Sequence, residues 1–239
     1  MSPRASPDSA AHRARPWRVH ELAADFELLD LWEIPIEADP AAGDDFAAFH
    51  HMFRAHGARF TDRPVYSLRP SSPSQLAHLV RLVGLGLLVG LRSALGRVFR
   101  WDRPERPDPI PGCPETSLRD RLRDEERTAA AAAAAVTREE PGGAFGFQTV
   151  YQLEKEALHE VSNKTIHALL HLSWVESAGR SPSVVLAIYV KSRGWQSRAY
   201  LALIKPFRHA VVYPAWIEHL TRTWACVRPG VSPPTSACR

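Results

Sequence analysis

The densest pattern of hydrophobic positions lies between residues 148 and 224. In NKTIHALLHLSWVE, polar and apolar residues alternate as in a β-strand, with Asn163, Thr165 and His167 opposite a row of apolar side chains. The following VVLAIYVK is almost continuously apolar and predicts a strand in the interior of a sheet. The preceding FGFQTVYQLEKEALHEV fits either a hairpin or a strand followed by a helical turn. Together these patterns predict a sheet of paired strands.

One long helix is predicted after the strands. From Ser197 to about Trp224, apolar residues recur every three or four positions, which is the period of an amphipathic helix. Pro206 and Pro214 each remove a backbone hydrogen bond to the preceding turn. We therefore expect a kink or a break at these two prolines.

The first half of the chain begins with a strand and a short helix. DLWEIPIE alternates loosely, and Pro35 favours an edge position or a strand end because proline cannot donate to a neighbouring strand. Asp44 or Asp45 can cap the helix that follows, DDFAAFHHMFRAH. Four bulky side chains share one face of this helix: Phe46, Phe49, Met52 and Phe53.

The most apolar run of the chain lies at residues 76–99. A membrane-spanning helix needs about 20 apolar residues, whereas only ten residues separate Arg81 from Arg92. This spacing favours a buried helix packed on a sheet, with a membrane-inserting helix as the alternative. Residues 103–143 combine a proline-rich loop with an alanine tract, which we interpret as a solvent-side helix or a tolerated insertion.

Length and composition predict a single domain of ordinary size. We expect residues 1–17 to be a disordered leader, 18–227 to form one α+β domain, and 228–239 to be a flexible tail. A net charge of +4, with arginines interleaved among acidic residues, disfavours nucleic acid as a partner. The start of the chain has no apolar segment typical of a secretory signal. The three cysteines form no CxxC pair, so a disulfide framework is not expected and a cytoplasmic location is favoured.

Several strings resemble the uncharacterised DUF2867 family, and the resemblance extends from Arg18 to Trp224. The matches are VHELAADFELLDLWEIPIE, GRVFRWD, TSLRDRL, VYQLEKEALHEVSNKTIHALLHLSWV and YVKSRGWQSRAYLALIKPFRHAVVYPAWI, of which PFRHAVVYPA is the most specific. The alanine tract departs from the family pattern. This bacterial family occurs alone or joined to dehydrogenase-like proteins, so the resemblance implies a dehydrogenase-like protein as a partner. It brings no established activity.

The resemblance also implies a fold. Such domains look similar to the helix-grip superfamily, which includes START and Bet v 1-like proteins. In that architecture an antiparallel sheet wraps around a long C-terminal helix and leaves a cavity between them. We therefore expect an α+β, helix-grip-like fold, with two helices inserted after the first strand.

One candidate site lies on the polar face of the strand at 163–171. His167 and Glu160 could exchange a proton near neutral pH, and Asn163 and Thr165 could orient a polar group of a ligand. This requires that the face lines a cavity. The uniformly apolar opposite face favours the other interpretation, in which these residues lie on the solvent side.

A second candidate site lies at the kink of the C-terminal helix. Lys205 and Arg208, in KPFRH, could bind an anion beside backbone N–H groups that a broken helix leaves free. The alternative, a solvated basic face, is favoured. Further candidates for lining a ligand cavity are aromatic residues and one histidine: Tyr151, Tyr189, Tyr200, Phe207 and His209.

Known catalytic and metal motifs are missing from the sequence. His167 and His171 lie about 13 Å apart on a strand, too far to share one ion. There is no HExxH, GxSxG or GxGxxG motif, and we expect neither a metal nor a cofactor.

These observations favour a binding protein over an enzyme. The leading hypothesis is that a small apolar or amphipathic molecule binds in a cavity between the sheet and the C-terminal helix. One alternative is a cyclase- or hydratase-like enzyme that uses the same cavity, with His167 and Glu160 as acid and base. The other is a peripheral membrane or partner-docking module that uses the 76–99 helix and the C-terminal helix.

Overall fold

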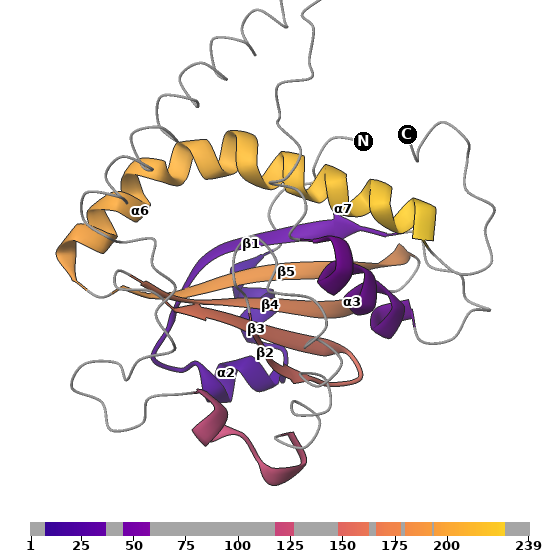
Figure 1. The fold of residues 1–239 in the computed structure, drawn as a ribbon, viewed down its shortest axis with the longest axis horizontal. Helices are drawn as coiled ribbons and strands as arrows, with labels where there is room; N and C mark the ends of the chain where they lie inside the picture. Colours follow the sequence, from indigo (N-terminus) through magenta and orange to yellow (C-terminus); the bar gives the residue numbers. More distant parts are fainter. Residues whose placement is uncertain are drawn as a thin grey trace, which may run out of the picture.

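The fold is α+β, with one five-stranded antiparallel sheet. The structure is a computed structural model, and it describes residues 8–36, 45–57, 118–126, 148–162, 166–177, 180–192 and 194–227. The strands follow the order β1-β5-β4-β3-β2 (Figure 1). Their bounds are β1 Glu27–Pro35, β2 Gln148–Gln152, β3 Glu156–Ser162, β4 Ile166–Ser177 and β5 Arg180–Ser192.

The strand positions agree with the pattern of hydrophobic residues. β1 lies at one edge of the sheet and ends at Pro35, as its proline predicts. The apolar β5 pairs with β1 on one side and β4 on the other, so it is interior. β2 and β3 pair antiparallel, which decides between the two interpretations of that segment in favour of the hairpin.

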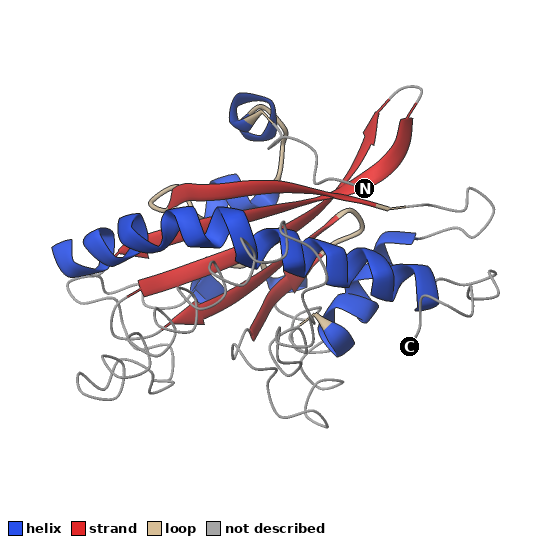
Figure 2. Ribbon diagram, turned by 90° about the horizontal axis from the view of Figure 1, so that it is seen from above, coloured by secondary structure: helices blue, strands red, loops and turns tan. Residues whose placement is uncertain are grey.

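The helices lie on both faces of the sheet. Figure 1 shows the C-terminal helix along one face and α2 on the opposite side, and the view from above places the C-terminal helix in front of the strands (Figure 2). The bounds are α1 Ser9–Arg13, α2 Arg18–Leu22, α3 Asp45–His56, η3 Leu118–Arg121, α6 Trp195–Phe207, η4 Arg208–Val212 and α7 Tyr213–Val227.

The predicted irregularity of the C-terminal helix is a π-helical turn rather than a break. The turn is η4, and it lies between Pro206 and Pro214. Neither proline has an N–H group, so the regular hydrogen-bond ladder is interrupted at both positions. The helix nevertheless continues from α6 through η4 into α7.

The core on the helix side of the sheet joins α3 and α7 to the strands. Phe46, Phe49, Met52 and Phe53 of α3 are all buried, in agreement with the helical pattern. From α7, a row of buried residues meets them: Tyr213, Trp216, Ile217, Leu220 and Trp224. In α6, by contrast, Ser197 is the one buried residue among those whose side chains are described.

The opposite face of the sheet is also covered, which corrects two expectations. Residues 8–17 are not disordered as predicted, because they include α1 and the buried His12. The face that carries His167 and His171 was expected to be exposed to solvent, but both histidines are buried. The reason is a second core, in which α2 and the segment that starts at Leu118 pack on this face. Leu118 lies within the expected insertion at 103–143.

Several predictions concern residues outside those that the structure describes. They are the predicted 76–99 helix, the alanine tract, Asn163 and Thr165 of the candidate site, and the tail at 228–239. The 76–99 helix would be the second of the two helices inserted after β1. Within the described segments, no helix is both long and apolar enough to cross a membrane. Cys226 in α7 is disulfide-bonded, although the cysteine spacing gave no reason to expect a disulfide framework.

Candidate functional site

A buried carboxylate marks the place where β1 meets the C-terminal helix. Asp30 has a fully buried side chain, whereas the other two acidic residues of β1, Glu27 and Glu33, are exposed and half-buried. Asp30 follows a β-bulge, since Leu28 pairs with Tyr189 and Asp30 with the adjacent Ile188, so that one residue of β1 is extra. Bulges often re-aim side chains next to functional sites, and π-turns such as η4 are also frequent there. Two backbone irregularities therefore meet at this carboxylate.

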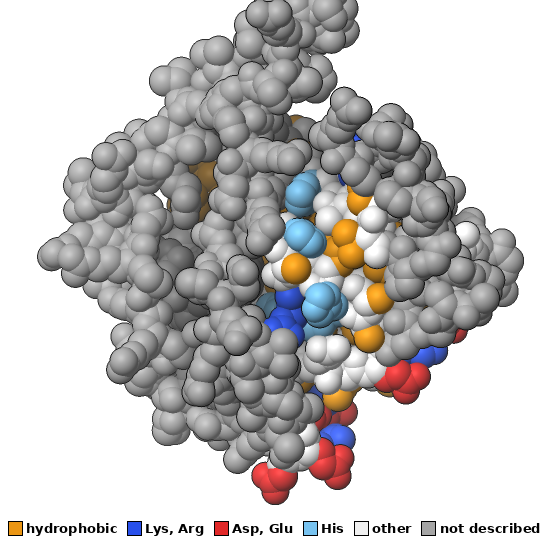
Figure 3. All heavy atoms as spheres, turned by 45° about the vertical axis from the view of Figure 1, so that its right-hand side comes forward, with side chains coloured by type: hydrophobic (Ala, Val, Ile, Leu, Met, Phe, Trp, Pro, Cys, Tyr) orange, Lys and Arg blue, Asp and Glu red, His pale blue; other side chains and the backbone are white. Residues whose placement is uncertain are grey.

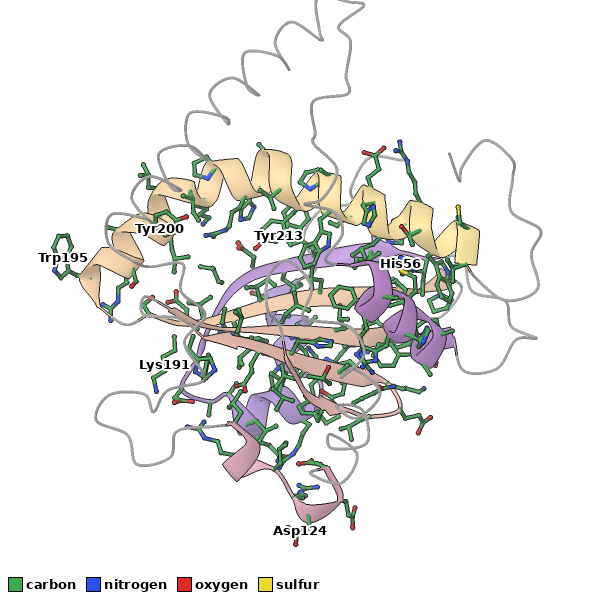
Figure 4. All side chains as sticks on the ribbon, in the orientation of Figure 1. His56, Asp124, Lys191, Trp195, Tyr200 and Tyr213 are labelled. Atoms are coloured by element: carbon green, nitrogen blue, oxygen red, sulfur yellow. The ribbon has the colours of Figure 1, made fainter. Side chains whose placement is uncertain are left out.

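Three residues of the C-terminal helix surround Asp30. Tyr213 donates its hydroxyl hydrogen to Oδ2 at 2.7 Å, and His209 Nε2 lies 2.6 Å from Oδ1. Arg208 Nη2 lies 3.1 Å from Oδ2, at ion-pair distance. Burial and the neighbouring Asp30 charge raise the pKa of Tyr213, so this phenol stays protonated and acts as a donor at physiological pH. In Figure 4, Tyr213 points from the helix towards the sheet.

The same cluster contains buried donors without an acceptor. Arg208 donates from Nη1 to the Leu201 carbonyl at 3.2 Å, but its buried Nε and Nη2 make no hydrogen bond within the described residues, although Nη2 lies at ion-pair distance from Asp30. The same holds for Nε1 of Trp32, whose ring lies 5.0 Å from that of Tyr213 and 5.4 Å from that of His209. Buried polar groups are normally paired, so these three N–H groups call for an acceptor.

A comparison with known protein families identifies the family of the chain. A family model described as a protein of unknown function, DUF2867, matches residues 22–215. The chain belongs to the DUF2867 family. The match includes β1 with Asp30 and extends through η4 to the start of α7, so the whole cluster around Asp30 lies within the DUF2867 region. No curated protein and no solved structure matches the chain.

A second polar cluster of this DUF2867 domain lies on the opposite face of the sheet, beneath α1 and α2. Its centre is Glu156, which accepts hydrogen bonds from the Tyr151 hydroxyl at 2.8 Å and from the backbone N–H of Arg18 at 2.9 Å. His171 Nε2 lies 2.9 Å from the same carboxylate. Hydrogen bonds from these donors lower the pKa of Glu156 although burial opposes this effect. Glu156 also lines a pocket of about 370 Å³ together with Arg18.

Next to Glu156, two histidines of the N-terminal segment meet one tyrosine of the sheet. His12 Nε2 lies 2.9 Å and His20 Nε2 3.2 Å from the Tyr189 hydroxyl. Burial, followed by the neighbouring His171, lowers the pKa of His12 to about 3, so this imidazole is neutral at pH 7. One histidine must therefore accept the phenol hydrogen while the other donates to the oxygen, which joins the N-terminal segment to β5.

The predicted acid–base pair is in contact, but it faces away from the C-terminal helix. His167 Nε2 lies 3.2 Å from Glu160 Oε2, and both side chains are buried. Phe26 covers His167 with a ring distance of 4.9 Å. Together with His171 and Glu156, this pair forms two Glu–His contacts between β3 and β4, on the same face of the sheet.

The predicted site residues thus separate onto two faces of the sheet. Arg208 and His209 lie at Asp30 on the helix side. Four others lie on the α2 side and cannot line a space between the sheet and the C-terminal helix: Tyr151, Glu160, His167 and Tyr189. Tyr200 is half-buried on α6, Lys205 is exposed and outside the Asp30 cluster, and the Phe207 side chain is outside the described set.

Histidines are frequent but do not form a metal centre in the described part of the chain. Some reach the surface among hydrophobic side chains (Figure 3). Within the described ranges, no group of three or more His, Cys, Asp or Glu residues is arranged to hold a metal ion.

The residues that the sequence interpretation missed are those whose partners are far away along the chain. A signal for Asp30 exists, because strand alternation places it on one face with Leu28, Trp32 and Ile34, and a carboxylate on an apolar face is unusual. Trp32 has no such signal, because tryptophan is common in strands; its position two residues further along only places it on the same face. Glu156 and His12 carry no local signal, since they acquire their roles only when the N-terminal helices pack on the sheet.

Proposed function

We propose that this DUF2867 domain binds a small amphipathic molecule between its sheet and its C-terminal helix, in a helix-grip-like arrangement. The observation that carries this proposal is the set of buried donors without an acceptor at Trp32 and Arg208. A folded protein seldom leaves such groups without a hydrogen bond, because each costs about 1–3 kcal/mol, and of the three only Nη2 also faces an opposite charge, that of Asp30. A ligand with a hydrogen-bond acceptor would remove this cost on binding.

The cluster also suggests which end of the ligand would lie there. All three groups are donors, so they favour an oxygen acceptor such as a carbonyl, hydroxyl or carboxylate. Nε and Nη2 lie on one edge of the guanidinium and can hold two oxygens at once. Asp30 lies at the same edge, 3.1 Å from Nη2, and its charge holds this arginine in place.

The apolar part of the ligand would lie along α6. By helical spacing Tyr200, Leu201 and Ile204 share one face of this helix, and all three are only half-buried. In α7, by contrast, the inner side is buried against α3 and β1. Contact with a ligand would bury the inner side of α6 at about 25 cal/mol for each Å² of apolar surface.

The first test is to identify what the protein carries. Native mass spectrometry of protein purified from its own host, followed by denaturing extraction, should reveal a stoichiometric small molecule with an apolar body and an oxygen-containing head. Protein that arrives empty, and that shows no thermal shift with a panel of fatty acids and alcohols, would contradict the proposal.

The second test concerns the binding residues. We expect Arg208→Gln and Trp32→Phe each to weaken binding of the identified ligand about tenfold or more, as expected for the loss of a buried hydrogen bond. Arg222→Gln, an exposed position on α7, is the control and should bind as the wild type does. Equal affinities in all variants, measured by calorimetry, would place the ligand elsewhere.

A second candidate function is acid–base catalysis of a cyclase or hydratase type. The observation in favour is the pair of buried Glu–His contacts, at 3.2 Å for Glu160 and 2.9 Å for Glu156. These pairs lie on the α2 side, so a substrate would have to reach them there. A screen for hydration and ring closure should find an activity that both Glu160→Gln and Glu156→Gln abolish. An activity that survives both changes would exclude these pairs.

A further inference from the structure

The outward side of α6 is apolar and exposed to solvent. Trp195 is 76% exposed and Leu203 is 68% exposed, the two highest values among the described large hydrophobic residues. The exposed apolar positions follow a helical spacing of four, three, one and three residues and therefore form one stripe. The stripe consists of Trp195, Ala199, Ala202, Leu203 and Pro206.

Trp195 occupies the free end of this stripe. It is the first residue of α6, and it points away from the rest of the molecule in Figure 4. An indole has an apolar body and a polar N–H, which is why tryptophan is enriched at the interface between membrane and water. Its position at the end of an exposed helix therefore favours contact with an interface over burial in a protein core.

Positive charges accompany the stripe, and negative charges are missing from this part of the sequence. Arg198 and Lys205 are exposed and lie seven residues apart, on one flank of the stripe. From Trp195 to Ile217 the sequence contains no Asp or Glu. An apolar stripe with only cationic neighbours complements a surface that is apolar beneath a layer of negative charge.

We infer that α6 docks on an anionic lipid surface, with Trp195 and Leu203 inserted among the headgroups and with Arg198 and Lys205 on the phosphates. The inner side of the same helix would remain directed towards the sheet. The surface is independent of the Asp30 cluster, because the stripe residues point away from the sheet. Docking would bring a membrane next to the helix under which we propose that a ligand binds.

The test is co-sedimentation with vesicles. The wild-type protein should bind vesicles of phosphatidylglycerol and phosphatidylcholine in equal parts and should not bind pure phosphatidylcholine. Arg198→Gln and Lys205→Gln should each weaken binding about fivefold. Trp195→Ala combined with Leu203→Ala should weaken it about tenfold, since part of the apolar burial is lost.

Matched controls lie on α7. Val227→Ser removes an exposed apolar side chain, and Arg222→Gln an exposed cation, without changing α6. Both should bind the anionic vesicles as the wild type does. All of these positions are exposed, so the circular dichroism spectra should remain unchanged and a loss of binding cannot be attributed to unfolding.

Three outcomes would overturn the inference. The first is a wild-type protein that does not bind the anionic vesicles. The second is a wild-type protein that binds neutral vesicles as strongly as anionic ones. The third is unchanged binding in the variants of α6. A dimer that dissociates on replacement of Trp195 and Leu203, with no vesicle binding, would show instead that a second copy of the chain covers the stripe.

Discussion

The pair formed by His50 and His159 makes the stability of the fold sensitive to acid. The two Nε2 atoms lie 3.1 Å apart, and both side chains are buried between α3 and β3. Burial, followed by the positive charge of Arg54, lowers the pKa of His50 to about 4, and burial also lowers that of His159. Both imidazoles are therefore neutral at pH 7, with one donating to the other.

The size of the effect follows from the difference in pKa between the folded and unfolded states. Unfolded His50 takes up a proton below its ordinary pKa of 6.5, whereas folded His50 does so only near 4. Its contribution to stability is therefore complete above pH 6.5 and decreases as the pH falls. Between 6.5 and 5 the decrease is about 2 kcal/mol for this one residue, at about 1.4 kcal/mol for each pH unit.

Urea titrations at pH 7 and pH 5 measure this quantity. The free energy of unfolding of the wild type should decrease between the two pH values, and in His50→Gln the decrease should be smaller by about 2 kcal/mol. His51→Gln changes the exposed neighbour on the same helix and should retain the wild-type decrease. If His50→Gln shows the same decrease as the wild type, the reasoning about this buried pair is wrong.

Three further experiments test other parts of the structure. Leu220→Ala, in the core between α7 and the sheet, should cost about 2–5 kcal/mol in urea titrations, and a loss well below 1 kcal/mol would contradict its burial. Asp30→Leu should cost about 3–5 kcal/mol because Arg208 loses its buried partner, and adding Arg208→Met should recover most of the loss. If the double variant is as unstable as the single one, the ion pair is not the cause. Tyr189→Phe removes the hydroxyl bonded to His12 and should speed tryptic cleavage in the segment 8–22, whereas an unchanged cleavage rate would show that this bond does not hold the segment.

The secondary structure was readable from the sequence because it depends on local periodicity. Alternation at residues 166–174 predicts β4, and the three- and four-residue spacing predicts the C-terminal helix. Pro35 predicts the edge position of β1, and the match of residues 22–215 confirms the resemblance to DUF2867. Each of these features is set by steric and hydrogen-bonding rules that act within a few residues.

The sequence alone could not decide what covers each face of the sheet. His167 stands opposite an apolar face, so alternation suggests that it is exposed, whereas in the structure it is buried, with the distant Phe26 ring against it. Likewise, Asp30 and Tyr213 are 183 residues apart, and no local pattern joins them. Periodicity determines which side chains share a face, whereas the partners of that face depend on contacts between distant segments. For this reason the sequence predicted the elements of this domain, and only the tertiary structure placed Asp30 with Arg208 and separated both from the Glu–His pairs.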